Sequence, residues 1–246
     1  MTASRTKRRL LFVICCFGLA LFVTLGAWQV ERRIWKLGLI ARVEARVHAA
    51  PVAAPPPAAW SSLQSAAAEY RRVKAIGVLR HDKETLVDAL TERGAGYWVV
   101  TPLVNGGVTI LVNRGFVPKD KADQQTRSVG QVGGPVAVTG LLRLTEPEGR
   151  FLRRNRPHQE RWYSRDVAAI AKARGLCPVA PFFIDADATA NPGGLPTGGL
   201  TVVRFRNTHL IYALTWFSLA ALSLAGLVIL RRDARVRRPP RFPESG

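Results

Sequence analysis

The sequence predicts an α+β membrane protein in which two transmembrane helices flank a β-rich domain outside the cytoplasm. The first observation is a pair of uncharged apolar runs, 10–30 and 210–230, each of twenty-one residues. The second is the stretch between them, in which short β-branched runs alternate with Gly and Pro turns. This spacing is typical of an antiparallel sheet that forms a small barrel or a curved sheet, here with one or two helices.

The two apolar runs are long enough to span a bilayer. At about 1.5 Å per residue each makes a helix of roughly 32 Å, against a hydrocarbon core of about 30 Å. Buried core helices rarely stay uncharged for so long, so we expect two membrane spans. The first run has the basic start of a signal peptide but exceeds its usual apolar length of about 7–15 residues. Trp28 and Gln29 do not form a small-residue cleavage site, which favours an uncleaved anchor.

Basic residues at both ends of the chain predict its orientation. Four cations precede the first apolar run, and six arginines follow the second. Because positive flanks stay inside, we expect both termini in the cytoplasm and the central domain in the periplasm of a bacterial inner membrane. The predicted segments are the cytoplasmic tail 1–9, the transmembrane helix 10–30, an amphipathic helix and linker 31–69, the periplasmic domain 70–208, the transmembrane helix 209–230 and the cytoplasmic tail 231–246.

The formal net charge of +19 does not indicate a nucleic-acid partner. Ten of the cations lie in the two tails, where topology explains them. The loop between the apolar runs has 26 Lys and Arg against 15 Asp and Glu, but it faces a compartment without nucleic acid. Membrane lipids with anionic headgroups are the partner that suits a basic surface held close to a bilayer.

The segment after the first apolar run predicts a helix and then a spacer. Apolar residues recur on one helical face, with cations between them, which indicates an amphipathic extension of the first helix. Its apolar positions are Ile34, Leu37, Ile40, Ala41 and Val47. The stretch 49–59 is too rich in proline to remain helical, so it predicts a semi-rigid spacer.

The domain is expected to begin near Tyr70 and to consist mainly of short strands. Asn105-Gly106-Gly107 predicts a hairpin turn. Ser164 and Gly175 are the expected caps of a short helix over 166–174. Apolar and β-branched runs predict strands over 72–79, 97–104, 108–113, 136–144, 182–185 and 200–205.

The sequence carries no motif of an enzyme or of a metal-delivery protein. It has no Cys-x-x-Cys, His-x-x-His or Gly-x-Ser-x-Gly pattern and no phosphate-binding loop. Cys15 and Cys16 lie in the first apolar run, so Cys177 is alone in the domain and can form no internal disulfide or soft copper site. A nucleophilic set of Cys177, His158 and Asp166 has no support from spacing. We therefore expect no catalytic residues and no resident metal.

Three features remain as candidate sites, each with a plainer alternative. Asp185 and Asp187 point the same way on a strand but are too few for a metal site, so they predict a polar strand end before a turn. The basic run 150–165 is either a solvated, partly paired loop or a surface for lipid phosphates, propionates or an acidic partner. His209, at the outer mouth of the second apolar run, can either ligate haem iron or bond to headgroups.

Seven ordered blocks of the sequence are specific enough to compare with known families. They are GAWQVERRIWKLGLI (26–40), GYWVVTPL (96–103), ILVNRGFVP (110–118), GLLRLTEPEGRFLRRNRP (140–157), RWYSRD (161–166), PFFIDAD (181–187) with PGG at 192–194, and GGLTVVRFRNTHLIYALTWFSLA (198–220). In this order the chain resembles the surfeit locus protein one family, the cytochrome c oxidase assembly factors of mitochondria and many bacteria. The resemblance covers about residues 25–220.

The resemblance implies an assembly role without turnover, in which the chain helps to place haem a in cytochrome c oxidase subunit one. It implies haem a as a transient cofactor, with His209 at the position of the family's proposed ligand. Arginines of the outer domain would pair with the haem propionates, and we select Arg153 and Arg154 for this role. Haem a synthase is a second expected partner. The competing class is a ligand-free scaffold or sensor, although tails of nine and sixteen residues are too short for an output domain.

Overall fold

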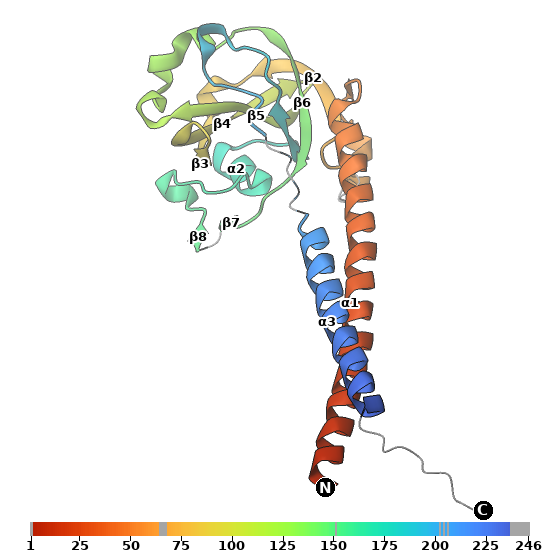
Figure 1. The fold of residues 1–246 in the computed structure, drawn as a ribbon. Helices are drawn as coiled ribbons and strands as arrows, with labels where there is room; N and C mark the ends of the chain where they lie inside the picture. The colour runs from red at the N-terminus through yellow and green to blue at the C-terminus, as the bar shows by residue number, and fades with distance from the viewer. Residues whose placement is uncertain are drawn as a thin grey trace, which may run out of the picture. The chain divides into compact units, whose positions relative to one another are not determined.

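The computed structural model describes residues 2–63, 68–150, 152–201, 203, 205 and 207–236. Contacts divide the chain into two units (Figure 1): Met1–Arg42 with Arg204–Gly246, called here the helix pair, and Val43–Val203, called the barrel domain. The helices and strands are α1 (Thr2–His48), β1 (Val52–Ala53), β2 (Arg72–Leu79), β3 (Thr85–Thr91), β4 (Gly94–Asn105), β5 (Val108–Pro118), β6 (Pro135–Leu144), β7 (Gly149–Arg150), β8 (Arg153–Arg154), α2 (Val167–Arg174), β9 (Val179–Ala186) and α3 (His209–Val236).

The helix pair consists of two long apolar helices. α1 is continuous over 47 residues, so the predicted extension beyond the first apolar run is confirmed. Each helix contains a span long and apolar enough to cross a membrane, and only 6% and 11% of the two spans is buried. Neither is therefore a buried core helix. Phe17 and Ile211 are more than 60% exposed, and continuous apolar surface of this kind needs lipid or a partner to cover it.

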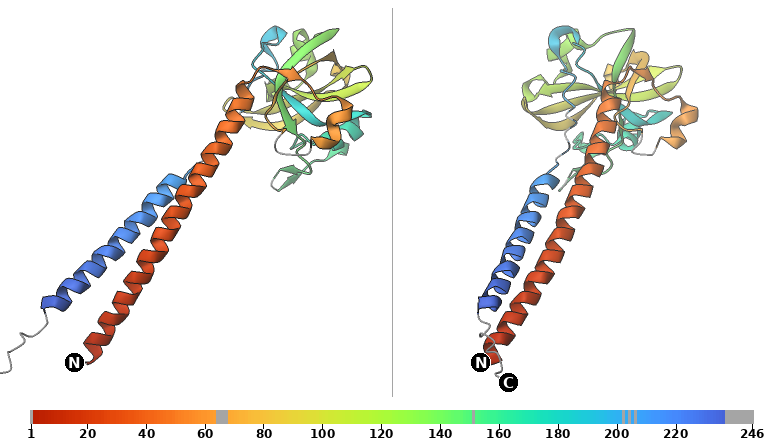
Figure 2. Two further views of the ribbon diagram at one scale, coloured as in Figure 1. Left: turned by 90° about the vertical axis from the view of Figure 1, so that its right-hand side faces the viewer. Right: turned by 45° about the vertical axis from the view of Figure 1, so that its right-hand side comes forward.

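α1 and α3 run antiparallel and lie side by side in all three views (Figures 1 and 2). Near one end of the pair the guanidinium of Arg231 lies 5.8 Å from the ring centre of Phe12. Further along, the rings of Phe22 and Trp216 stack at 5.8 Å. Residue numbers rise along α1 as they fall along α3, so the start of α1 and the end of α3 lie at the same end of the pair. This arrangement agrees with an expected topology in which both termini are on one side.

Five strands of the barrel domain close into a barrel, as the sequence predicts. The order is β2-β6-β9-β5-β4, and β4 pairs again with β2 to complete the ring. The prediction of an antiparallel sheet is wrong at two pairs, because β5–β9 and β1–β2 are parallel. Five strands cannot alternate in direction all the way around a closed ring, so the ring itself requires one parallel neighbour pair.

The predicted hairpin turn is confirmed. β4 ends at Asn105 and β5 begins at Val108. Gly106 and Gly107 between them have φ of 55° and 81°. A two-residue loop with positive φ at both positions matches the twist of the flanking strands, and glycine adopts it without a steric penalty.

Two predicted segments differ from the structure. The spacer 49–59 is part of the domain: Val52 pairs with Val73, and Trp60 packs against the core. The compact unit consequently begins at Val43, ahead of the predicted boundary at Tyr70. The predicted strand 200–205 is not found, since residues 200, 201, 203 and 205 have no regular secondary structure and 202 and 204 lie outside the described residues.

The N-cap of α2 was assigned to the wrong residue. Asp166, and not Ser164, accepts a hydrogen bond from the backbone N–H of Ala169. The Ser164 hydroxyl instead donates to the Glu146 carbonyl at 2.7 Å. Gly175 ends the helix with φ of 60°, as predicted.

Alternate residues of β9 enter two separate cores. Phe182 and Ile184 face the barrel interior, among side chains from all five ring strands. Phe183 joins a second cluster that α2 covers, together with Trp162 and Ile170. β9 is therefore buried on both faces, which explains its nearly continuous apolar sequence. Asp185 lies on the face of Phe183, because side chains two residues apart share one side of a strand.

Candidate functional site

The candidate site lies between α1 and α3, near the start of α3. Gly26 of α1 is buried against the ring of Phe217, and a Cβ atom at Gly26 would come within 2.7 Å of that ring. Small residues let transmembrane-type helices pack tightly. The same face of α1 carries Gln29 one turn later, since residues three apart are neighbours on a helix.

His209 is the first residue of α3, at the end of its apolar span, as the sequence predicts. Its Nδ1 lies 2.8 Å from the Oε1 atom of Gln29, a residue 180 positions earlier in the chain. An amide oxygen can only accept, so this bond needs the proton on Nδ1. The lone pair of a neutral imidazole is then on Nε2, which has no hydrogen-bond partner among the described residues.

A second polar atom near His209 lacks a partner. The Oδ1 atom of Asn207 is buried and has no hydrogen bond within the part of the chain that the structure describes. Buried polar groups are nearly always paired with protein or water. An imidazole nitrogen and an amide oxygen without partners fit a place where a polar or metal-containing ligand binds. The residues present therefore suit axial ligation of a haem iron by His209.

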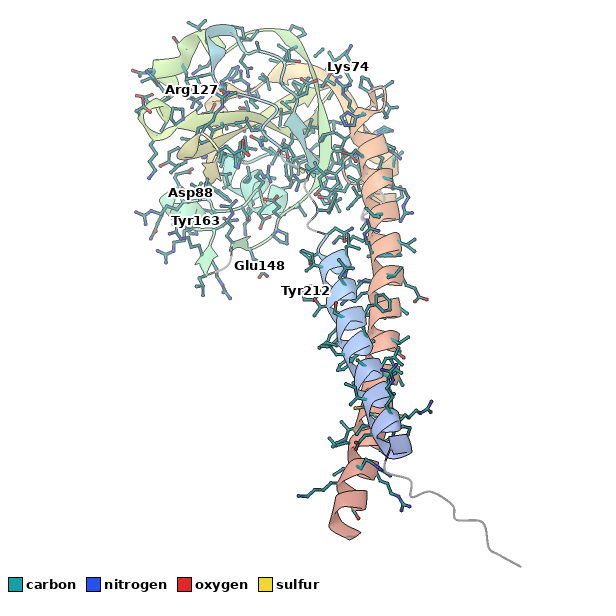
Figure 3. All side chains as sticks on the ribbon, viewed as in Figure 1. Lys74, Asp88, Arg127, Glu148, Tyr163 and Tyr212 are labelled. Atoms are coloured by element: carbon teal, nitrogen blue, oxygen red, sulfur yellow. The ribbon has the colours of Figure 1, made fainter. Side chains whose placement is uncertain are left out.

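The structure places Arg153 and Arg154 in β8 of the barrel domain, in a short hairpin with β7. Arg153 is 65% exposed, lies 3.5 Å from Asp88 and stacks over the ring of Tyr163. These two partners are labelled in the barrel domain in Figure 3. Arg154 is exposed. The hairpin borders an open hollow of about 840 Å³ whose lining includes Leu152, which is 90% exposed, and the four arginines Arg150, Arg153, Arg154 and Arg156.

Asp185 is the centre of a buried charge cluster, so the interpretation as a polar strand end is wrong for this residue. Its side chain is 1% exposed. Oδ1 accepts hydrogen bonds from Asn113 at 2.7 Å and from Arg165 at 2.8 Å, and Oδ2 accepts one from Arg143 at 3.1 Å. Arg165 belongs to the predicted basic run, but it is buried in this cluster and is not part of the exposed arginine surface.

The cluster is stabilised by further carboxylates. Arg165 also pairs with Glu146, and Arg143 pairs with Glu69 at 3.1 Å. Burial alone would raise the pKa of Glu146, but the hydrogen bonds and charge of Arg165 hold it below its ordinary value. Burial would lower the pKa of Arg165, but the charges of Asp185 and Glu146 raise it. Glu146 and Arg165 therefore both stay ionised at neutral pH, and each is paired with residues of the same domain.

The other sequence candidates do not form a common site. Asp187 lies in a turn, where it accepts hydrogen bonds from Thr189 and pairs with Arg72 at 3.4 Å. No group of three His, Cys, Asp or Glu side chains that could hold a metal ion occurs among the described residues. Cys177 is exposed and free. Gln29 was missed, although it is the only amide side chain in the first apolar run.

Comparison with known proteins covers the barrel domain and parts of both apolar helices. The model of the SURF1 family matches residues 16–221. Surfeit locus protein 1 of Rattus norvegicus is 45% identical over 80% of this chain and 68% of its own length, and that of Homo sapiens is 43% identical over 86% and 72%. A SURF1-like protein of Monosiga brevicollis is 40% identical over 89% and 87%. A match that covers the whole barrel domain and part of each long helix places this chain in the SURF1 family.

Proposed function

We propose that the chain assists the assembly of cytochrome c oxidase by holding haem a for transfer to oxidase subunit one. The role is the one that the family resemblance implies. The observation that carries the haem-binding part is the Nε2 atom of His209, which is unpartnered among the described residues while Nδ1 is held by Gln29. A ligating histidine in a metal site has this pattern, with its second ring nitrogen bonded to an acceptor.

The proposed place of action is a bacterial inner membrane. The exposed apolar spans of α1 and α3 would lie in lipid, with both termini in the cytoplasm and the barrel domain in the periplasm. His209 would then lie at the outer interface, where an apolar macrocycle can remain in lipid and its anionic groups can reach water. Haem a synthase, which makes the cargo, would be a second partner, and membrane lipids would surround the pair.

Each residue of the proposed site has a separate role. His209 would donate its Nε2 lone pair to the iron of haem a, which would accept an imidazole nitrogen as a ligand. Arg153 and Arg154 would pair with the propionates, since guanidinium groups bind carboxylates through two parallel hydrogen bonds. No residue is assigned a catalytic role, and we propose that the chain is not an enzyme.

The test is the absorption spectrum of the full chain purified from cells that make haem a. We expect the wild-type protein to carry haem a, and His209→Ala to lower its haem content by more than about tenfold, because loss of even an outer-shell partner costs about 10–100-fold in metal affinity. His209→Met retains a possible ligand and should raise the reduction potential of bound haem. His158→Ala, which removes an exposed imidazole of the barrel domain, is the matched control.

Two outcomes would contradict the proposal in different ways. Wild-type protein without haem, or His209→Ala with an unchanged spectrum, would rule out ligation by His209. Deletion of the chain separates assembly from the alternatives: the oxidase should then contain less haem a, while quinol oxidases with other haems stay normal. A ligand-free scaffold or sensor would instead leave the remaining oxidase fully loaded with haem.

A further inference from the structure

Gln29 and His209 are the strongest hydrogen-bonding side chains of the two apolar spans. The first run contains no other amide, and the polar groups of the second are hydroxyls and the indole N–H of Trp216. Such hydroxyls bond locally: Thr24 donates to the Ala20 carbonyl of its own helix at 2.8 Å. Gln29 instead bonds across to α3. A strongly polar side chain in an apolar helix is costly unless it is paired, which favours a specific partner.

We propose that Gln29 is a positioning residue that fixes the tautomer and the ring orientation of His209. The amide oxygen accepts the proton of Nδ1 at 2.8 Å and thereby leaves the lone pair on Nε2. An isolated imidazole has no such constraint, and its proton is free to reside on either nitrogen. That this tautomer prepares His209 to ligate iron rests on the function proposed above. The assignment of the proton to Nδ1 does not rest on that function.

The packing around this pair holds the two side chains in place. Phe22, Gly26 and Gln29 share one face of α1, because they are spaced four and three residues apart. On that face Phe22 stacks on Trp216 at 5.8 Å, and Gly26 lies against Phe217. The helices therefore approach closely within one turn of Gln29. This packing keeps the amide of Gln29 within hydrogen-bond distance of Nδ1, at 2.8 Å.

The first test needs no haem. The full chain, labelled with ¹⁵N-histidine and held in detergent micelles, reports the protonated nitrogen of each of its four histidines by NMR. The signals that are absent from the spectrum of His209→Ala are those of the His209 ring. We expect wild-type His209 to carry its proton on Nδ1, and Gln29→Leu to move it to Nε2. Thr24→Val, which removes a polar group from the same helix without touching His209, should change nothing.

A wild-type His209 with its proton on Nε2 would overturn the proposal, since the amide would then be donating to Nδ1. An unchanged tautomer in Gln29→Leu would overturn it as well. The second test uses protein from cells that make haem a. There Gln29→Leu should lower haem content by about 10–100-fold, or raise the reduction potential of the haem that remains, because an unsupported imidazole is a weaker donor.

The two tests separate this inference from the proposed function. Wild-type protein that lacks haem but shows the Nδ1–H tautomer, lost in Gln29→Leu, would refute haem binding and support the positioning role. Haem that depends on His209 but is unaffected in content, spectrum and potential by Gln29→Leu would support the function and overturn the positioning role.

Discussion

The barrel domain and the helix pair each contain a partly buried histidine, and the two histidines use their ring nitrogens differently. In His81 of the barrel domain, Nε2 donates to the Val132 carbonyl at 3.1 Å and Nδ1 faces a guanidinium nitrogen of Arg114 at 3.5 Å. In His209 only Nδ1 is engaged, by Gln29. A neutral imidazole has one donor and one acceptor. Both are occupied in His81, whereas the acceptor of His209 has no partner among the described residues.

The charged groups of the barrel domain are likewise paired with one another. In the barrel domain, Asp185 accepts hydrogen bonds from three internal donors. Glu84 pairs with Arg127, and the side chains of these two residues are almost fully buried. Polar groups that satisfy one another stabilise the fold and offer little to a ligand. The polar atoms left without a partner beside α3 are the ones that a ligand can satisfy. The comparison agrees with a structural role for the buried charges of the barrel and with the binding role that we propose for His209. Two neutral polar atoms of the barrel, Oγ1 of Thr101 and Nε1 of Trp162, are also buried without a partner among the described residues.

The largest expected effect is the loss of stability in Asp185→Ala. The substitution removes a fully buried carboxylate that accepts hydrogen bonds from Asn113, Arg143 and Arg165, although the two arginines keep Glu69 and Glu146 as partners. Breaking a buried ion pair on one side costs about 3–5 kcal/mol. We expect the free energy of unfolding to fall by about that amount. Urea unfolding of the detergent-solubilised chain, followed by tryptophan fluorescence, measures it.

The matched control is Asp187→Ala, two residues later and just beyond the end of β9. Its carboxylate is 28% exposed and pairs with Arg72 at 3.4 Å, so the cost should stay below about 1 kcal/mol. Equal costs for the two substitutions would contradict the structural role of the cluster. Metal-dependent stability at Asp185 would also contradict it, because the carboxylate would then have a ligand other than the arginines.

Much of the fold is predictable from local patterns in the sequence. The two long helices follow from the length of the apolar runs, and the β4–β5 hairpin follows from Gly106 and Gly107. β3 is not predicted, because Leu, Asp and Ala residues separate its β-branched Thr85, Val87 and Thr91 and weaken the local strand pattern. Its strand conformation depends on pairing with β4, from Thr85↔Val100 to Thr91↔Gly94. The parallel β5–β9 pair joins segments about seventy residues apart, which no local pattern encodes.

The candidate site was predictable only in part. His209 was found from its place at the end of an apolar run and from the family resemblance. Gln29 could have been found as the lone amide of the first run, but its partner lies 180 residues away. Asp185 was taken for a strand end because its partners Arg143 and Arg165 come from separate segments, 42 and 20 residues earlier in the chain. Pairing of this kind depends on the closed barrel.

A smaller effect is expected in the pH dependence of stability, through His81. Burial lowers the pKa of His81, the charges of Arg114 and Arg127 lower it further, and the Val132 bond and Glu84 oppose them. The unfolded chain then binds a proton near pH 6.5 while the folded chain does not. Stability from His81 is therefore present above about pH 6.5 and is lost as the pH falls toward the lowered folded value.

Thermal unfolding of the detergent-solubilised chain between pH 7.5 and 5.5 tests this assignment. We expect the wild-type midpoint to fall on acidification by about 1–3 °C, and His81→Gln, which keeps a donor for Val132, to show a smaller fall. His158→Gln removes an exposed imidazole and should keep the wild-type dependence. A pH dependence that survives unchanged in His81→Gln would show that this histidine is not held neutral by its surroundings.

The smallest effect on stability is expected for the exposed arginines of the β7–β8 hairpin. In a chain with Arg153→Gln and Arg154→Gln together, the free energy of unfolding should change by less than about 0.5 kcal/mol, because only Arg153 has a long, exposed ion pair, with Asp88. The same variant should carry a few-fold less haem a, since one or two exposed charge pairs contribute about 0–1 kcal/mol each.

The matched control for this pair is Arg93→Gln, which removes an exposed arginine from the turn between β3 and β4. It should leave both stability and haem content at wild-type values. If the double variant also keeps wild-type haem content while His209→Ala loses it, the propionates do not use Arg153 and Arg154. Binding would then be a property of the helix pair alone. If the double variant loses haem with its stability unchanged, the barrel domain contributes to haem binding through Arg153 and Arg154. The polar residues of the barrel would then serve binding as well as the stability of the fold.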